Sequence, residues 1–327
     1  MTPWNLLALP PLPEDLLRAL LAPLGERVLV RVPARRDREA LLAALADAEI
    51  VLGDWSGTLA MDAAAVAAAP RLAFVQQPAV GVDGHDLDAL ARAGVPLANT
   101  AGVSATAVAE WCVAAALALG RRLLAADAAV RAGRWPQQEL GPRELAGSRV
   151  GIVGYGPIGA ECARLFRAFR CEVAYWTRTP REDPAFTPLD ELVATADVLV
   201  VVIALSERTR GLIDPLAMKR GALLVNAARG GVVREDTLTA ALGGHLGGAA
   251  LDVFDTEPLP EGHPLRAVSG DLVLSPHVAG VTAQATGRLI EAVLANLAAA
   301  VSGAPVKDVV NGLPGMITRH FGGSPST

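Results

Sequence analysis

The sequence has little cysteine and no excess of positive charge, and both deficits exclude classes of protein. The three cysteines, Cys112, Cys162 and Cys171, are an odd number without CxxC spacing, so we expect neither a disulfide framework nor a thiolate metal or redox centre. A formal net charge of −5 provides no broad basic surface for phosphate backbones, and no lysine run marks a membrane-binding stretch. We therefore expect no nucleic-acid partner, no membrane association and no metal site.

Long hydrophobic runs and targeting signals are also missing. The apolar stretch 105–119 contains Glu110 and is followed by Arg121 and Arg122, so it is too short to span a membrane and favours a buried helix. The N-terminal sequence MTPWNLLALPPLPEDLL lacks the charged start and the small-residue cleavage site of a signal peptide, which favours a cytoplasmic location. With 327 residues, 52% of them apolar, the chain is long enough for two domains with separate cores.

Short apolar runs alternate with helical patterns in two parts of the chain. In the first hundred residues the runs are RVLVRV, EIVLGD, LAFVQQ and PLAN, and helices are expected to begin near Asp37, Asp62 and Asp86. A second series starts at Arg149 with RVGIVGYG and continues through CEVAYW, DVLVVVIAL, GALLVNAA, GGAALDV and DLVLSP. Strands separated by helices of this length predict two parallel α/β sheets.

The stretch between the two series, 104–133, has helical periodicity and predicts one long bridging helix. Residues 284–301 predict another helix. If that helix packs back on the first sheet, the N-terminal domain is discontinuous. The expected domains are then residues 1–103 together with 285–327, and residues 104–284 inserted between them.

The segment VGIVGYGPIGAECARLFRAF has the pattern of a dinucleotide-binding turn. Gly154, Gly156 and Gly159 form a GxGxxG motif between an apolar strand and a helix. In this context the first glycine permits the tight turn, the second lets the backbone approach a pyrophosphate, and the third allows close packing of helix and strand. Pro157 and Ile158 open the helix whose N-terminus would face the phosphates. We therefore expect this segment to bind NAD or NADP.

The residues after the second strand of this series bear on which of the two dinucleotides binds. An acidic residue there accepts hydrogen bonds from the ribose hydroxyls of NAD, whereas an arginine pairs with the 2′-phosphate of NADP. This chain has Thr177, Arg178 and Thr179, with Arg181 close behind and no carboxylate nearby. The pattern favours NADPH. The alternative is a solvated arginine at a strand end, with a loose choice between NADPH and NADH.

Three polar stretches follow apolar strands in the second half: NAARGGVV with Arg229, LDVFDTEPLP with Asp252 and Glu257, and SPHVAG with His277. Each could be structural alone, but ligands of open α/β sheets bind at such strand ends. Reduction of a ketone needs a cation that holds the neighbouring carboxylate and an acid that protonates the oxygen. Arg229 fits the first role and His277 the second, with Glu257 as the carboxylate that orients His277 and favours its protonated form. The other histidines fit less well, although His85 follows a glycine turn and could lie near a substrate.

With these motifs the chain resembles the D-isomer-specific 2-hydroxyacid dehydrogenases over nearly its full length. The matching segments are QQPAVGVD, NTAGVSATAVAEW, VGIVGYGPIG, NAARGG, ALDVFDTEPLP and SPHVAG. The resemblance implies an α/β protein of two domains, a flavodoxin-like substrate domain and an inserted Rossmann cofactor domain with a doubly wound parallel sheet. It also implies a homodimer joined through the cofactor domains.

The resemblance extends to individual residues of the site. It implies that the arginine, glutamate and histidine above are the catalytic trio, that Asp252 holds the nicotinamide amide, and that the backbone at Val80 and Gly81 contacts the substrate carboxylate. Two positions depart from the common pattern of the family. Ala227 stands where threonine or serine is frequent, and Ala204 where proline is frequent, so the fine contacts to the cofactor stay open there.

The expected reaction is reduction of a small 2-keto acid, such as glyoxylate or hydroxypyruvate, to the D-2-hydroxy acid. A strand ending in Trp-Thr-Arg resembles the NADPH-preferring reductases of the family. One alternative is an NAD-linked dehydrogenase of another 2-hydroxy acid, and another is a dinucleotide-sensing corepressor, since such proteins can retain the trio. A long-form phosphoglycerate dehydrogenase is less expected, because too few residues follow Gly312 for a regulatory domain. The substrate itself is not specified, because loops of unknown packing shape its pocket.

Overall fold

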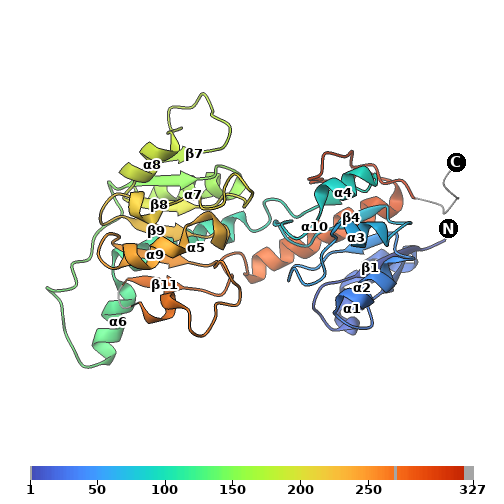
Figure 1. Ribbon diagram of the computed structural model, residues 1–327, viewed down its shortest axis with the longest axis horizontal. Helices are drawn as coiled ribbons and strands as arrows, with labels where there is room; N and C mark the ends of the chain where they lie inside the picture. The colour runs from blue at the N-terminus through green and yellow to red at the C-terminus, as the bar shows by residue number, and fades with distance from the viewer. Residues whose placement is uncertain (1, 269–270, 320–327) are drawn as a thin grey trace. The chain divides into compact units, whose positions relative to one another are not determined.

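The computed structural model (Figure 1) describes residues 2–268 and 271–319, and the chain divides into two compact units. Unit 1 contains Met1–Val103 and Ala283–Thr327, and unit 2 contains Ser104–Thr282. The second passage between units therefore falls at 282–283, against 284–285 expected from the sequence.

The ends of the segments meet within each unit. In unit 2, a Cβ built on Gly280 would lie 3.4 Å from Cβ of Ser104. In unit 1, Nε of Arg288 donates a hydrogen bond to the carbonyl oxygen of Val103 at 2.9 Å. The first and last residues of unit 2 therefore lie close together.

Unit 1 is built on a five-stranded parallel sheet with the order β2-β1-β3-β4-β5. This is the flavodoxin-like order, as expected. The strands are β1 (Trp4–Ala8), β2 (Val28–Arg31), β3 (Ile50–Leu52), β4 (Phe74–Gln76) and β5 (Leu97–Ala98). Strand β1 is missing from the sequence-based expectation, because its assignment depends on pairing with β2 and β3 and not on its own five residues.

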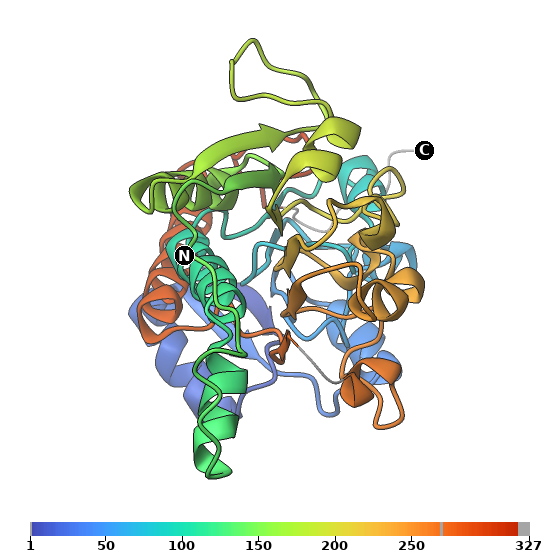
Figure 2. The ribbon, with the colours of Figure 1, turned by 90° about the vertical axis from the view of Figure 1, so that its left-hand side faces the viewer.

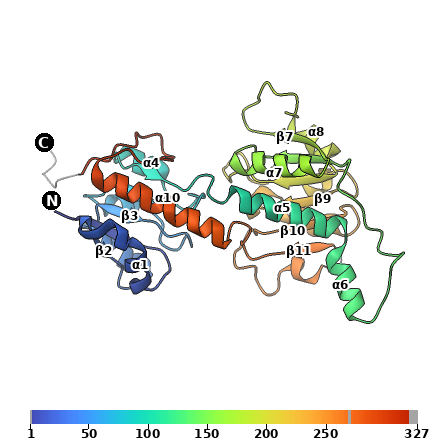
Figure 3. The same ribbon diagram turned by 180° about the vertical axis from the view of Figure 1, so that it is seen from behind.

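The helices of unit 1 cover both faces of this sheet (Figure 3). They are α1 (Glu14–Leu21), α2 (Arg38–Leu45), α3 (Ala63–Ala67), α4 (Leu87–Arg92) and α10 (Ala283–Ser302), with the 3₁₀ helix η1 (Ala22–Arg27) after α1. The three expected starts are confirmed: Asp37, Asp62 and Asp86 are the N-caps of α2, α3 and α4. Each carboxylate accepts a hydrogen bond from the backbone N–H three residues later, which satisfies one unpaired donor of the helix.

Helix α10 is long and apolar enough to cross a membrane by length and composition alone. Its apolar stripe, however, packs in the core of unit 1 through Val293, Leu297 and Ala300. Asn296 on the same helix is buried, and its side-chain amide donates to Oε1 of Gln76 at 2.9 Å. These contacts are those of a helix that covers a sheet.

Unit 2 is built on a six-stranded parallel sheet with the order β7-β6-β8-β9-β10-β11. The strands are β6 (Arg149–Val153), β7 (Glu172–Trp176), β8 (Val198–Val201), β9 (Leu223–Asn226), β10 (Gly248–Leu251) and β11 (Leu272–Leu274). Phe186 adds a parallel bridge to Tyr175 on the outer side of β7, in the place of the third strand of a dinucleotide-binding fold. The expected doubly wound Rossmann sheet is therefore confirmed, and its strand order reverses between β6 and β8.

Helices cover both faces of this sheet as well. Helices α8 and α9 lie on the face seen in Figure 1, and α5 and α7 lie on the face seen in Figure 3. The helices of unit 2 are α5 (Ala105–Gly120), α6 (Leu123–Arg131), α7 (Pro157–Ala168), α8 (Leu189–Thr195), α9 (Glu235–Leu242), and the 3₁₀ helices η2 (Pro215–Ala217), η3 (Gly230–Val232) and η4 (Pro264–Ala267).

The expectation of one long helix over 104–133 is wrong, because the chain breaks between α5 and α6. Arg122 has a φ of 51°, which ends the helical path. Its guanidinium pairs with Asp271 and donates to the carbonyl oxygen of Leu140 at 2.9 Å, so its partners hold it in this conformation. Beyond the break, α6 extends away from the sheet of unit 2 (Figure 2).

Candidate active site

The glycine turn after β6 has the geometry that a pyrophosphate requires. Gly154 has a φ of 102°, and a Cβ on it would lie 2.8 Å from the carbonyl oxygen of Val202. A Cβ on Gly159 would lie 2.0 Å from the carbonyl oxygen of Gly154, so α7 packs directly on the turn. Around Gly156 the space is open, with no heavy atom within 4 Å of an added Cβ. The first two glycines allow the turn and the approach of a ligand, and the third allows the helix to start there.

The N-terminus of α7 faces the same turn. Gly156 is its N-cap and provides no side-chain hydrogen bond, and Pro157 at the first position has no N–H to satisfy. The backbone N–H groups of Ile158 and Gly159 belong to the first turn, which has no preceding carbonyls within the helix. Such a terminus fits the diphosphate of a dinucleotide, because its N–H groups and its dipole favour negative charge.

At the end of β7, the side chains that bear on dinucleotide choice are accessible. Arg178 is exposed and Thr177 is half-buried. The hydroxyl of Thr177 donates to the carbonyl oxygen of Thr179 at 2.6 Å. Among the described residues, Arg178 has no ion-pair partner. Arg181 lies instead with its guanidinium 5.8 Å from the ring centre of Tyr155, which stacks on Tyr175.

One carboxylate lies closer to this strand than the sequence spacing suggests. The hydroxyl of Tyr175 donates to Oδ2 of Asp183 at 2.9 Å, and Asp183 also accepts from the backbone N–H of Ala185. The N–H of Ala185 and the hydroxyl of Tyr175 lower the pKa of Asp183, so the group stays ionised. The expectation of no carboxylate nearby is therefore wrong for the structure, although Asp183 is held by Tyr175 and not by the strand end itself.

Arg229 lies in the loop that follows β9, with its side chain half-buried. Its Nη1 donates to the carbonyl oxygen of Ala228 at 2.7 Å, and its own carbonyl accepts from the side-chain amide of Asn226 at 3.3 Å. The next residue, Gly230, touches the loop after β10, since a Cβ on it would lie 2.0 Å from the carbonyl carbon of Phe254. Ala227 precedes them, with its N–H bonded to the carbonyl oxygen of Val201 on β8.

Glu257 and His277 face each other from the loops that follow β10 and β11. Nδ1 of His277 lies 2.7 Å from Oε2 of Glu257, and Oε1 of Glu257 accepts from the backbone N–H of Phe254 at 3.0 Å. Both side chains are accessible, at 47% for His277 and 35% for Glu257. The contact orients the imidazole and leaves Nε2 as the ring nitrogen that can serve a ligand. The expected partnership of these two side chains is present in the structure.

Asp252 has a structural task that the sequence did not indicate. It is 2% exposed, and its carboxylate accepts hydrogen bonds from the backbone N–H groups of Val278 and Ala279 at 2.9 and 2.8 Å and from the hydroxyl of Ser275. Its carbonyl oxygen also accepts from the backbone N–H of His277 at 2.8 Å. His277 has a φ of 54°, a conformation that these bonds support. Asp252 therefore fixes the loop that carries the histidine.

In unit 1, Val80 and Gly81 lie in the loop after β4. Val80 is 39% exposed, and its carbonyl oxygen accepts from the side-chain amide of Asn99 at 2.8 Å. Gly81 lines a cavity of about 70 Å³ together with Trp55, Gln77 and other residues of the same unit. The loop is thus anchored from the following strand, with its backbone beside a small hollow.

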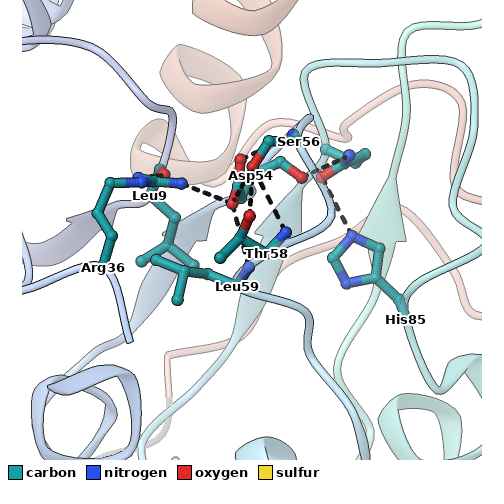
Figure 4. Close-up of polar contacts among 8 residues, drawn as sticks. Leu9, Arg36, Asp54, Ser56, Thr58, Leu59 and His85 are labelled. Atoms are coloured by element: carbon teal, nitrogen blue, oxygen red, sulfur yellow. Dashed lines mark hydrogen bonds and ion pairs between the residues drawn. The ribbon is translucent and has the colours of Figure 1, made fainter. Parts of the chain in front are cut away.

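The same hollow borders the polar cluster shown in Figure 4. Asp54 follows β3 at the point where the strand order of unit 1 reverses, and it accepts from Nη2 of Arg36 at 2.6 Å and from the hydroxyl and the N–H of Ser56. His85 accepts from the N–H of Met61 through Nδ1, so Nε2 carries its proton toward Oε1 of Gln77 at 3.1 Å. Burial lowers the pKa of His85, against the charges of Asp54 and Asp83, and favours the neutral ring.

No cluster of metal-ligating side chains occurs in residues 2–268 and 271–319. Ala204 lies in the loop after β8, where its carbonyl oxygen accepts from the hydroxyl of Thr209 at 2.8 Å. The candidate residues of unit 2 lie in loops at the carboxyl ends of its parallel strands.

Comparison with known proteins identifies relatives over most of the chain. The family model described as D-isomer specific 2-hydroxyacid dehydrogenase, NAD binding domain, matches residues 113–279. A glyoxylate reductase of Thermofilum pendens is 36% identical over 292 residues, which cover 84% of this chain and 82% of that protein. A solved 2-hydroxyacid dehydrogenase from Ketogulonicigenium vulgare is 30% identical with a TM-score of 0.81, covering 95% of this chain and 99% of that one.

A D-3-phosphoglycerate dehydrogenase of Mycobacterium tuberculosis is also 36% identical, over 319 residues. The alignment covers 94% of this chain but 59% of that protein. The chain therefore spans less than two thirds of the length of this relative.

Proposed function

Because the chain belongs to the D-isomer-specific 2-hydroxyacid dehydrogenase family, we propose that it reduces a small 2-keto acid to the D-2-hydroxy acid with NADPH or NADH. The observation that carries the proposal is the contact of 2.7 Å between His277 and Glu257, whose loop adjoins that of Arg229. Glyoxylate and hydroxypyruvate are the substrates we favour, in agreement with the glyoxylate reductases among the relatives.

Each member of the trio has a separate task in the proposed reaction. A bound reduced nicotinamide would supply the hydride that reduces the keto carbon. Arg229 binds the substrate carboxylate and polarises the carbonyl, since its planar guanidinium can donate two parallel hydrogen bonds. His277 donates a proton from Nε2 to the carbonyl oxygen, and Glu257 stabilises the protonated ring through Nδ1. The backbone at Val80 and Gly81 provides further donors to the carboxylate.

For the cofactor, we propose a preference for NADPH. Arg178 lies exposed in the loop directly after β7 and has no ion-pair partner among the described residues, so it is available for a 2′-phosphate. The glycine turn and the N-terminus of α7 would hold the diphosphate, through Gly154, Gly156 and Ile158. Asp252 would also contact the nicotinamide amide, while its carboxylate keeps the hydrogen bonds that it accepts from the backbone of the loop after β11.

The two units take separate roles in this proposal. Unit 1, Met1–Val103 with Ala283–Thr327, forms the substrate domain, and unit 2, Ser104–Thr282, forms the cofactor domain. A cytoplasmic location belongs to the proposal as well, and it agrees with three buried thiols that form no disulfide.

We also propose that the protein is a homodimer joined through unit 2. Helix α6 and the segment after it expose large apolar side chains, Leu123, Leu124, Val130 and Trp135, each more than half accessible. Exposed apolar groups on a projecting element are typical of a surface that a second copy covers. Analytical ultracentrifugation of the protein and of a Leu124→Glu variant tests this, with a shift of the variant to monomer as the expected result.

The test of the reaction is a panel of 2-keto acids assayed with NADPH and with NADH, by loss of absorbance of the reduced nicotinamide. We expect turnover with glyoxylate or hydroxypyruvate, and chiral analysis should identify the D-hydroxy acid where the product is chiral. A corepressor that only senses dinucleotides would bind NADPH or NADH without steady turnover of any member of the panel.

A further inference from the structure

The loop that carries Glu257 has no regular secondary structure between β10 and η4. Its first residue, Asp252, is buried, but Glu257 itself is accessible. The distance of 2.7 Å between Glu257 and His277 therefore depends on what holds this irregular segment in place. The side chain of Glu235 contacts this segment and fixes it.

Glu235 is the first residue of α9, and its carboxylate is 12% exposed. Oε2 accepts from the backbone N–H of Asp255 at 3.0 Å, and Oε1 lies 2.6 Å from Nε2 of His263. The two contacts lie on either side of Glu257 in the chain. One carboxylate thus bridges the loop at both flanks of the proposed acid's partner.

The other contact of His263 determines the tautomer of its neutral ring. Nδ1 accepts a hydrogen bond from the backbone N–H of Leu265 at 3.3 Å, so in the neutral ring the proton is on Nε2. That proton points at the carboxylate of Glu235. His263 therefore serves as a fixed donor between η4 and α9.

An acidic residue in the first turn of a helix could have a simpler explanation, because carboxylates favour the positive end of the helix dipole. Asp236, the next residue, has that arrangement and pairs with Arg234 at 3.2 Å. Glu235 differs, since both of its oxygens are engaged by the loop after β10. Burial and the charge of Glu235 raise the pKa of Asp255, against the charge of Arg210, in agreement with a carboxylate pressed on this loop.

We propose that Glu235 and His263 are positioning residues that hold the loop of Glu257 so that its carboxylate meets His277. The proposal rests on the proposed function of His277 as proton donor. Phe254 completes the arrangement, because its N–H holds Oε1 of Glu257 and leaves Oε2 for the histidine. A loosened loop releases the accessible Glu257 side chain from the imidazole.

The experiment compares Glu235→Gln with the wild-type protein in reduction of the best keto acid. The amide keeps the shape but presents an N–H to one of the two donors, so the bridge breaks at one flank. We expect NADPH binding to be unchanged, kcat to fall roughly tenfold to hundredfold, and the alkaline limb of the pH profile to move to lower pH. Glu191→Gln, in an exposed pair with Arg149 on the same unit, is the matched control and should leave all three quantities unchanged.

Two further variants separate positioning from a general structural role. In a Glu257→Gln background, Glu235→Gln should cause no additional shift of the limb, because the contact that it supports is already lost. His263→Gln retains a side-chain N–H toward Glu235 and should have a pH–rate profile close to that of the wild-type protein. His263→Phe lacks this donor and should resemble Glu235→Gln.

The outcomes distinguish the two proposals. A wild-type protein without turnover of any keto acid overturns the proposed function and the positioning role with it. The positioning role alone is overturned if Glu235→Gln has the kcat and the alkaline limb of the wild-type pH profile. It is also overturned if the shifts of that limb in Glu235→Gln and Glu257→Gln add in the double variant.

Discussion

At the scale of single residues, Arg178 has the clearest consequence for cofactor choice. Replacement by alanine removes the guanidinium proposed to pair with the 2′-phosphate of NADPH, and NADH has no such group. We expect kcat/KM with NADPH to fall roughly tenfold to hundredfold, the effect of one charge-assisted hydrogen bond, with little change for NADH. Steady-state kinetics with both cofactors measure it. Arg164→Ala, which removes an exposed pair with Glu161 on α7, is the control, and equal use of both cofactors by the wild-type protein contradicts the assignment.

The pair of His277 and Glu257 predicts a pH dependence. In reduction, activity should fall as pH rises, because the imidazole loses the proton that it donates. The charge of Glu257 favours the protonated ring, so Glu257→Gln should move the alkaline limb to lower pH. His277→Ala should abolish most turnover at every pH while NADPH binding is retained. Rate profiles over pH measure both, and a limb that stays in place in Glu257→Gln would leave the carboxylate with an orienting role only.

At the scale of elements, the close approach of two loops at Gly230 predicts a large effect of one methyl group. A Cβ there would lie 2.0 Å from the carbonyl carbon of Phe254 and 2.3 Å from the backbone nitrogen of Asp255, and backbone atoms cannot move aside cheaply. Gly230→Ala should therefore separate the loops of Arg229 and Glu257, at a cost of about 1–3 kcal/mol in unfolding free energy and most of the turnover.

The matched control for this substitution is Gly262→Ala, in the loop after β10, where no atom lies within 4 Å of an added Cβ. Thermal unfolding and kcat should both stay close to the wild-type values in that variant. Wild-type turnover in Gly230→Ala would show that the two loops can separate without loss of the site.

The elements also show what the sequence could predict and why. The N-caps Asp37, Asp62 and Asp86 act through bonds three residues away, so local spacing was sufficient to find them. Strand β1 was missed, because its assignment depends on pairing with β2 and β3 and not on its own five residues. The break at Arg122 depends on Asp271, a distant residue that no local pattern indicates.

The site divides in the same way. Spacing and residue type predicted that Glu257 would accompany His277, because strands β10 and β11 are neighbours and their loops leave the sheet at one edge. The bonds from Asp252 to the backbone of Val278 and Ala279 were not predicted, since backbone donors carry no signal in the sequence. The bridge by Glu235 was missed for the same reason, as one of its partners is a backbone N–H.

At the scale of the whole molecule, Arg319 joins the two chain segments of unit 1. Its guanidinium pairs with Glu49 at 2.7 Å, donates to the carbonyl oxygens of Thr2 and Pro3, and lies 4.8 Å from the ring centre of Trp4. Glu49 is fully buried. Burial acts to raise the pKa of Glu49, but hydrogen bonds from Arg319 and from a backbone N–H, with nearby charges, lower it overall.

This arrangement predicts acid-sensitive stability of unit 1. Because the pKa of Glu49 is lower in the folded protein, its contribution is fully present above the unfolded-state value of about 4.3 and is lost as pH falls through the folded value. Arg319→Ala should destabilise unit 1 by about 3 kcal/mol near neutral pH, with the difference shrinking in acid. Denaturant unfolding from pH 7 to pH 3 measures it.

Arg18→Ala, which removes an exposed pair with Glu14 on α1, is the control and should change stability little at any pH. A destabilisation by Arg319→Ala that is the same at both ends of the pH range would assign its effect to packing on Trp4.

The meeting of Gly280 with Ser104, and of Arg288 with Val103, makes unit 2 a cassette. A segment whose two ends lie together can be removed, replaced or inserted by one recombination event without stretching the chain that receives it. A gene for unit 1 can thus exchange its dinucleotide-binding cassette whole, at the junctions 103–104 and 282–283. Under the proposed assignment of the cofactor to unit 2 and the keto acid to unit 1, each preference can change while the other is kept.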